Sequence, residues 1–335
     1  MWFFRSPLEG VGGDKVAGRC GVFPAEGVTE NKNRRFLVGV RGRIPPFCLL
    51  FLLLLSCGKS SPVIKDGADL RIVSFAPSIT EILYELGLGE NVFGVTQFCK
   101  YPEQTAQKSR VGGYTNPNYE AVLRLKPNLV ILLNGNNTLT RFLDKNSIRY
   151  ISVGNDSVEE IIESVQTIAK ACNTAEKGDS LAQRLSLQLK TSSSNAHRPK
   201  VYLCVGRDNI GGGSISKCFA AGSVSFYSQI IEAAGGENIF ATVSQPYPSI
   251  SSEALIRFNP DIVIDISAAY MNASLDERTV CADWEIFKNV SAVKNKEVHC
   301  LFGDYLTVPG PRLFMVAERF RNIISAWSEK QEGKS

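Results

Sequence analysis

This chain of 335 residues has few histidines, little excess of one charge and few long apolar runs. Only two histidines occur, His197 and His299, too few for a receptor that grips bare zinc through several imidazoles. P-loop, GxSxG, HExxH and CxxC motifs are absent, so nucleotide-phosphate, serine-hydrolase, zinc-protease and thioredoxin-like chemistry have no support. We therefore expect a protein without catalysis, resident metal or cofactor.

The charge balance excludes nucleic acid as the main partner. Lysine plus arginine is 37 and aspartate plus glutamate is 33, a formal net charge of +4. Residues 1–56 carry eight basic and four acidic side chains, so the whole surplus lies there. With 44% hydrophobic and 21% charged residues, the composition predicts one or two globular domains with a substantial core.

The apolar run Phe47–Leu55 has nine residues, against about 20 for a helix that crosses a bilayer. It follows Arg41 and Arg43 and precedes small residues, which is the order of a secretory signal over residues 1–56. The tetrad Leu54–Cys57 resembles a bacterial lipobox, so we expect Cys57 to be acylated and to become the first mature residue. The protein would then be a membrane-anchored lipoprotein in the periplasm or on the cell surface. The alternative is a plain signal peptide.

Residues 1–35 do not fit a signal, whose basic region normally begins within a few residues of the start. We expect that translation begins near residues 37–40 and that Met1 is an early assignment; a real cytoplasmic extension is the alternative. On the other side of the signal, residues 57–69 form a polar tether.

Six cysteines remain once the leader and Cys57 are set aside. An extracytoplasmic location permits disulfides, and six cysteines allow fifteen complete pairings, so the connectivity stays open. The six are Cys99, Cys172, Cys204, Cys218, Cys281 and Cys300.

Apolar strands alternate with short helices along the mature chain, which predicts an α/β protein with parallel sheets. We expect one lobe over 70–156 and a second over 199–330. Between them, residues 157–198 form a helical connection, in which Ser157-x-x-Glu160 and Asn173-x-x-Glu176 read as capping boxes. The expected strands are 71–75, 91–95, 129–133, 148–153, 200–205, 261–266 and 297–302.

An internal repeat supports two equivalent lobes. Residues 120–131 align with residues 253–264 and are identical at six of twelve positions. Each copy is a helix that opens with a glutamate, Glu120 or Glu253, followed by a proline turn and a buried strand. A glutamate at a helix start stabilises the helix dipole, but one in each lobe also favours ion pairing with a symmetric partner. Glu81 reads instead as part of a capping box with Ser78.

Aromatic residues gather in the loops that follow the expected strands. Parallel sheets bind ligands at their carboxyl ends, and pockets favour domain interfaces. Rings offer a large contact area with few rotatable bonds, which suits a large, rigid, partly apolar ligand in a cleft between the lobes. Gly211–Gly213 could cradle an anion, but we expect a flexible loop. The aromatic candidates are Phe98, Tyr101, Tyr114, Tyr247 and Tyr305.

Six segments of the mature chain, taken together, point to one family. They are Arg71–Glu81, Gly94–Pro102, Val111–Ile131, Gly235–Phe240, Tyr247–Glu253 and Pro309–Arg312. These segments resemble the helical-backbone periplasmic binding proteins that serve ABC importers of vitamin B12, ferric siderophores and haem. The resemblance covers roughly residues 70–330 in consistent order and is strongest toward the vitamin B12 receptors.

The resemblance implies roles for particular residues. Phe98, Tyr114 and Tyr247, with Asp304 and Tyr305 nearby, would line the cobalamin cleft. Glu120 and Glu253 would dock onto arginines of a permease dimer that works with an ATPase.

The sequence departs from the vitamin B12 receptors at several positions. Tyrosines replace the family's tryptophans at Tyr114, Tyr247 and Tyr305, and an aromatic is missing near Leu133. Haem therefore stays open, because tyrosine can ligate its iron. An anionic ferric siderophore would need cleft arginines, for which Arg207 and Arg312 are candidates, although Arg312 could simply brace the C-terminal loop. From another class, a corrinoid- or haem-handling enzyme or sensor domain is the alternative.

Overall fold

The computed structural model describes residues 70–190, 198–267 and 275–333. The leader, the tether, Cys57 and His197 lie outside the described residues. Among the helices of the described part, none is long and apolar enough to cross a membrane.

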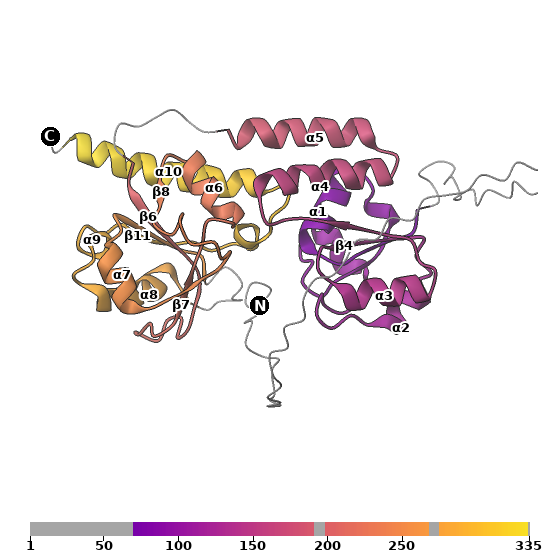
Figure 1. The fold of residues 1–335 in the computed structure, drawn as a ribbon, viewed down its shortest axis with the longest axis horizontal. Helices are drawn as coiled ribbons and strands as arrows, with labels where there is room; N and C mark the ends of the chain where they lie inside the picture. The colour runs from indigo at the N-terminus through magenta and orange to yellow at the C-terminus, as the bar shows by residue number, and fades with distance from the viewer. Residues whose placement is uncertain (1–69, 191–197, 268–274, 334–335) are drawn as a thin grey trace, which may run out of the picture. The chain divides into compact units, whose positions relative to one another are not determined.

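The first lobe, which we define as β1–β5 with their helices, is built on one parallel sheet of order β3-β2-β1-β4-β5. Figure 1 labels strand β4 of this sheet and the helices α1, α2 and α3 around it. All four predicted strands are confirmed, and the five residues of β4 are all buried. The strands are β1 (Ile72–Ser74), β2 (Val92–Val95), β3 (Ser109–Arg110), β4 (Leu129–Leu133) and β5 (Tyr150–Val153). The helices are α1 (Pro77–Glu85), α2 (Tyr119–Leu125) and α3 (Asn137–Lys145), with 3₁₀ turns at Gly89–Asn91 and Glu103–Gln107.

Two helices form the predicted connection, α4 (Val158–Ala171) and α5 (Ala175–Gln188). They lie close together, since a Cβ on Gly178 would stand 2.2 Å from the Cβ of Ala169. The Ser157 hydroxyl accepts a hydrogen bond from the Glu160 amide, which confirms that cap. The capping box predicted at Asn173 is wrong: Asn173 has φ 58° and Thr174 is the N-cap, because the chain turns sharply between the two helices.

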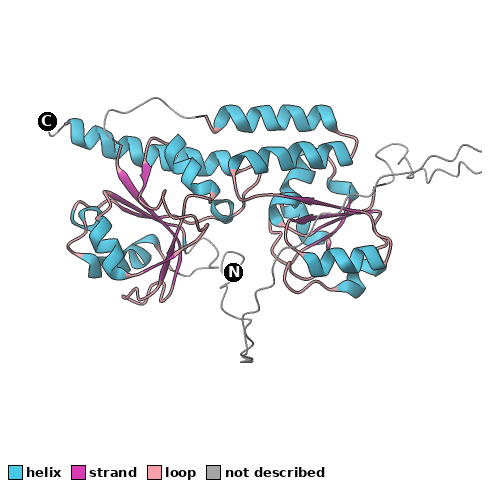
Figure 2. Ribbon diagram, in the orientation of Figure 1, coloured by secondary structure: helices cyan, strands magenta, loops and turns pink. Residues whose placement is uncertain are grey.

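The second lobe, which we define as β6–β11 with their helices, has a six-stranded sheet whose strands run mostly parallel to β6. Figure 2 draws the strands in magenta and the helices in cyan. The three predicted strands are confirmed. The sequence analysis missed the short strands β7, β8 and β9. Strand β7 pairs antiparallel with both β6 and β9, and β8 pairs parallel with β6. The strands are β6 (Lys200–Arg207), β7 (Cys218–Ala220), β8 (Glu237–Asn238), β9 (Ser249–Ile250), β10 (Ile262–Asp265) and β11 (Val298–Cys300).

The helices of the second lobe end with a 20-residue helix for which the sequence analysis made no prediction. Its buried residues, from Leu313 to Trp327, recur at helical spacing and join the largest apolar core of the lobe. The helices are α6 (Phe226–Ala233), α7 (Ser252–Phe258), α8 (Glu277–Ala282), α9 (Ser291–Lys294) and α10 (Leu313–Glu332), with 3₁₀ segments at Asp283–Phe287 and Asp304–Thr307.

Candidate functional site

The candidate ligand residues of the first lobe stand in loops that follow its strands. Phe98 lies after β2 and is 36% exposed. A Cβ on Gly113 would be 3.2 Å from the Phe98 ring, so the glycine leaves room for that ring. The Tyr114 hydroxyl donates a hydrogen bond of 2.6 Å to the carbonyl of Asn134, at the end of β4. The loops after β3 and β4 are thereby joined at the carboxyl edge of the sheet.

In the second lobe, Tyr247 and Tyr305 are partly buried and pack against the main apolar core. Tyr305 follows Gly303, whose φ is 133° and whose added Cβ would meet the Tyr305 ring at 2.5 Å. Only glycine is compatible with that backbone and that close ring. The two tyrosines are therefore placed by their own lobe, each with part of its ring at the surface.

Arg312 contacts two of the predicted ligand residues, Tyr101 and Asp304. Its guanidinium lies over the Tyr101 ring, 4.0 Å from the ring centroid, and forms an ion pair with Asp304 at 3.0 Å. It also forms an ion pair with Glu81 at 2.6 Å. The capping box predicted for Glu81 is wrong, because Ala76 is the N-cap of α1 and makes no side-chain cap. Arg312 therefore does more than brace the C-terminal loop: it joins α1 of the first lobe to the second lobe.

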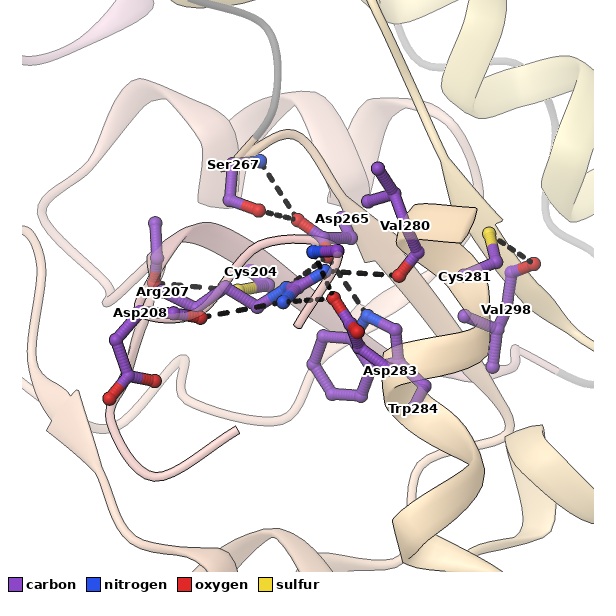
Figure 3. A network of polar contacts seen from close by, with 12 residues as sticks. Cys204, Arg207, Asp208, Asp265, Ser267, Val280, Cys281, Asp283, Trp284 and Val298 are labelled. Carbon is purple, nitrogen blue, oxygen red and sulfur yellow. Dashed lines mark hydrogen bonds and ion pairs between the residues drawn. The ribbon is translucent and has the colours of Figure 1, made fainter. Parts of the chain in front are cut away.

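Arg207 is unavailable to a ligand, which corrects its candidacy for an anionic chelate. Its side chain is 0% exposed and lies between Asp265 and Asp283, each 2.8 Å away (Figure 3). The indole of Trp284 donates a further hydrogen bond to Asp265 at 2.9 Å. The guanidinium of Arg207 therefore forms its ion pairs with carboxylates of the second lobe itself.

The Gly211–Gly213 loop is held in place, contrary to the expected flexible loop. The backbone amides of Gly211 and Gly213 both donate to the Asp283 carboxylate. That carboxylate also pairs with Arg207, so the loop is tied to the buried network. Its amides serve a residue of the chain itself rather than an external anion.

The repeat helices α2 and α7 have matching ends. Asn118 caps the first and Ser251 the second, and both helices finish on a residue with a left-handed backbone, Lys126 and Asn259. Glu120 and Glu253 are exposed at equivalent positions.

Three residues after each glutamate, one helical turn away, stands an exposed apolar side chain. Leu123 is 44% and Ile256 is 49% exposed. Each repeat helix thus offers a carboxylate and an apolar group on one face, in a matching pair.

One polar pocket opens at the carboxyl ends of β4 and β5, and its lining includes Asn134, the hydrogen-bond partner of Tyr114. Its walls include carboxylates of α4, and no aromatic side chain lines it. It is lined by Asn134, Ser152, Val153, Gly154, Glu160, Glu163, Ser164 and Thr167. The sequence analysis did not single out this pocket.

The remaining chemistry-bearing groups within residues 70–190, 198–267 and 275–333 form no further centre. No cluster of three or more metal-ligating side chains occurs among the described residues. Burial lowers the pKa of His299, whose ring lies 3.3 Å from the Glu297 carboxylate. The six mature-chain cysteines, all within the described ranges, are unpaired.

Known proteins provide an independent comparison. The periplasmic binding protein family matches residues 72–303. A cobalamin-binding protein of Halobacterium salinarum is 29% identical over 278 residues, covering 78% of this chain and 71% of the relative. A vitamin B12-binding protein of Vibrio parahaemolyticus is 24% identical over 266 residues, covering 76% and 90%.

Solved structures agree on the fold. The periplasmic vitamin B12 binding protein of Vibrio cholerae has a TM-score of 0.63 at 24% identity, covering 77% of this chain and 97% of that one. The periplasmic haem binding protein of the same organism has a TM-score of 0.66 at 20% identity, covering 76% and 98%. These relatives are binding proteins, not enzymes. The chain, with its two α/β lobes and helical connection, belongs to the periplasmic binding protein family and has a substrate-binding role.

Proposed function

We propose that this protein is the receptor of an ABC importer for cobalamin or a related corrinoid. The observation that carries the proposal is the state of the two candidate arginines. Arg207 and Arg312 each lie between two carboxylates. The positive charge of each guanidinium is already neutralised by its carboxylate partners, so neither arginine suits an anionic siderophore. The aromatic loops suit a large ligand with apolar faces.

The corrinoid assignment is tested by titrating residues 58–335 with cyanocobalamin in a calorimeter. We expect saturable binding of one ligand per chain, in the micromolar range or tighter. Tyr114→Ala and Tyr247→Ala should each weaken binding, because each removes a ring from a different lobe. Leu187→Ala is a matched control, since Leu187 is exposed on α5, away from the candidate loops. Absence of binding by the unaltered chain would refute the corrinoid assignment.

Haem is the second candidate ligand. Tyrosines at Tyr114, Tyr247 and Tyr305 favour it, because a phenolate can ligate haem iron. The haem-binding fold neighbours are compatible with this ligand as well. Titration with haemin, followed by visible absorbance, distinguishes the two candidate ligands. A spectrum typical of tyrosine-ligated haem that saturates at one haem per chain would make haem, and not cobalamin, the assigned ligand.

Delivery to the importer is the second half of the proposal. The lipid on Cys57 would hold the receptor at the membrane, and Glu120 and Glu253 would dock one on each half of a permease dimer. The matched ends and exposures of α2 and α7 support this symmetric docking. Labelling cells with a radioactive or alkyne fatty acid would test the anchor: a Cys57→Ala chain should lose the label, and a chain that keeps it would refute acylation at this residue.

A further inference from the structure

Arg312 and Glu81 are 231 residues apart in the sequence and yet share two hydrogen bonds. The Nε of Arg312 donates to Glu81 at 3.0 Å and the Nη2 donates at 2.6 Å. On its other side the guanidinium donates two hydrogen bonds of 3.0 Å to Asp304. One planar group therefore holds two carboxylates, each through both of its oxygens.

The segment before Arg312 packs directly on the first lobe. A Cβ on Gly310 would lie 3.3 Å from the Cα of Ser78 and 3.6 Å from the Glu81 carboxylate. Glu81 is 2% exposed, and its pair with Arg312 is accordingly shielded from solvent. The chain approaches α1 so closely at Gly310 that a Cβ there would force its neighbours to shift slightly.

Arginine is the side chain that this site needs. Lysine has its donors on a single nitrogen, so it cannot form paired hydrogen bonds to both carboxylates, and it lacks the flat face that stacks on the Tyr101 ring. Loss of the guanidinium would leave the Glu81 carboxylate buried without a counter-charge. The charged groups around Glu81 are Arg312 and Asp304 from the second lobe and Glu85 from its own helix.

We propose that Arg312 is a positioning residue of the ligand site, which holds Tyr101 of the first lobe and Asp304 of the second lobe in a fixed relation through its bridge to Glu81. The inference rests on the proposed function, because Tyr101 and Asp304 are expected to contact the ligand. It goes further in assigning a role to two residues, Arg312 and Glu81, that need not touch the ligand themselves.

The test compares Arg312→Met, Arg312→Lys and Glu81→Gln in the 58–335 chain. Cyanocobalamin affinity is measured by calorimetry, at a temperature where circular dichroism shows each variant fully folded. We expect at least a tenfold rise in Kd for Arg312→Met and a smaller rise for Arg312→Lys, which keeps the charge. In a double-mutant cycle, Glu81→Gln should add little to Arg312→Met, because both changes break the same bridge.

Arg184→Met is the matched control. Arg184 also pairs with a glutamate of α1, Glu85, at 2.7 Å, but the two side chains are 56% and 42% exposed. Such an exposed pair contributes little, so its removal should leave Kd within twofold.

Hydrogen exchange provides a readout that needs no ligand. In Arg312→Met, exchange should rise together in residues 76–86 and 303–313, the two segments that the bridge connects, while Arg184→Met leaves the second segment unchanged. Unchanged Kd in Arg312→Met would overturn the positioning role, even if exchange rises. If the unaltered chain binds neither cobalamin nor haemin, the proposed function fails; the bridge is then supported by coupled exchange in the two segments and overturned by its absence.

Discussion

Arg207 and Arg312 make the same kind of cluster in two different places. Each guanidinium lies between two carboxylates, at distances from 2.6 to 3.0 Å. The side chain of Arg207 is 0% exposed and both partners belong to its own lobe. Arg312 is 13% exposed, and one partner, Glu81, belongs to the other lobe. The first cluster therefore holds one lobe together, whereas the second links parts of two lobes.

The largest expected effect comes from breaking the cluster within one lobe. Arg207→Met should lower the free energy of unfolding by about 3–5 kcal/mol, because two buried carboxylates lose their counter-charge. The Gly211–Gly213 loop should loosen with it, since Asp283 holds that loop. Urea denaturation and hydrogen exchange of the loop check this. A loss below about 1 kcal/mol would mean that the cluster is no stronger than an exposed pair.

The second effect is a pH dependence that belongs to the cluster between the lobes. Burial raises the pKa of Glu81 from 4.5 to about 6, although the hydrogen bonds and charge of Arg312 act in the opposite direction. A carboxyl whose pKa is raised by folding stabilises the fold below its unfolded pKa, and this contribution is lost as pH rises through the folded pKa.

Between pH 4.5 and above pH 6, this residue alone should therefore reduce the free energy of unfolding by about 2 kcal/mol. Glu81→Gln should remove that part of the pH dependence, as measured by urea denaturation between pH 4 and pH 8. An identical pH profile for the variant and the unaltered chain would show that Glu81 does not titrate in this range.

Exposed carboxylates offer the contrasting case. Glu120→Ala combined with Glu253→Ala should leave the free energy of unfolding nearly unchanged, because solvent screens both exposed carboxylates and their effect on the helix dipole is small. Ligand affinity should stay within twofold while uptake by cells is lost, because the role that we propose for these carboxylates is docking and not ligand binding. Normal uptake by this double variant would refute the docking role.

The exposed apolar side chains next to these glutamates provide a second test of the docking role. Leu123→Ala with Ile256→Ala should weaken binding of the loaded receptor to the reconstituted permease and ATPase by roughly tenfold, because truncating an interface anchor commonly costs more than 1 kcal/mol. Leu187→Ala is again the matched exposed control. Equal binding by the double variant and the control would limit docking to the carboxylates.

The smallest expected effect concerns Arg184→Met, which should alter the free energy of unfolding by about 0.5 kcal/mol or less. The pair of Arg184 with Glu85 joins α5 to α1 but stays in solvent. A loss as large as that of Arg207→Met would show that partner identity, rather than burial, determines the strength of these clusters.

Local patterns explain which parts of the fold were predictable. The bounds predicted for β4 agree with the structure, because a run of five buried apolar residues is readable over a few positions. Short strands were missed: β7 has three residues and β9 has two, too few to show alternation. The predicted caps at Ser78 and Asn173 failed because serine, asparagine and glutamate at that spacing also occur in turns and ion pairs.

The sequence by itself determined the α/β class, the repeat of α2 and α7, the positions of the aromatic loops and the family resemblance, because each depends on residues close together in the chain. Only the tertiary structure decided which carboxylates pair with Arg207 and Arg312. Arg207 and Arg312 look alike as isolated residues, and their partners lie as far as 231 positions away. The energy of a charge depends on its burial and its counter-charge, and both are determined by the packing of distant segments.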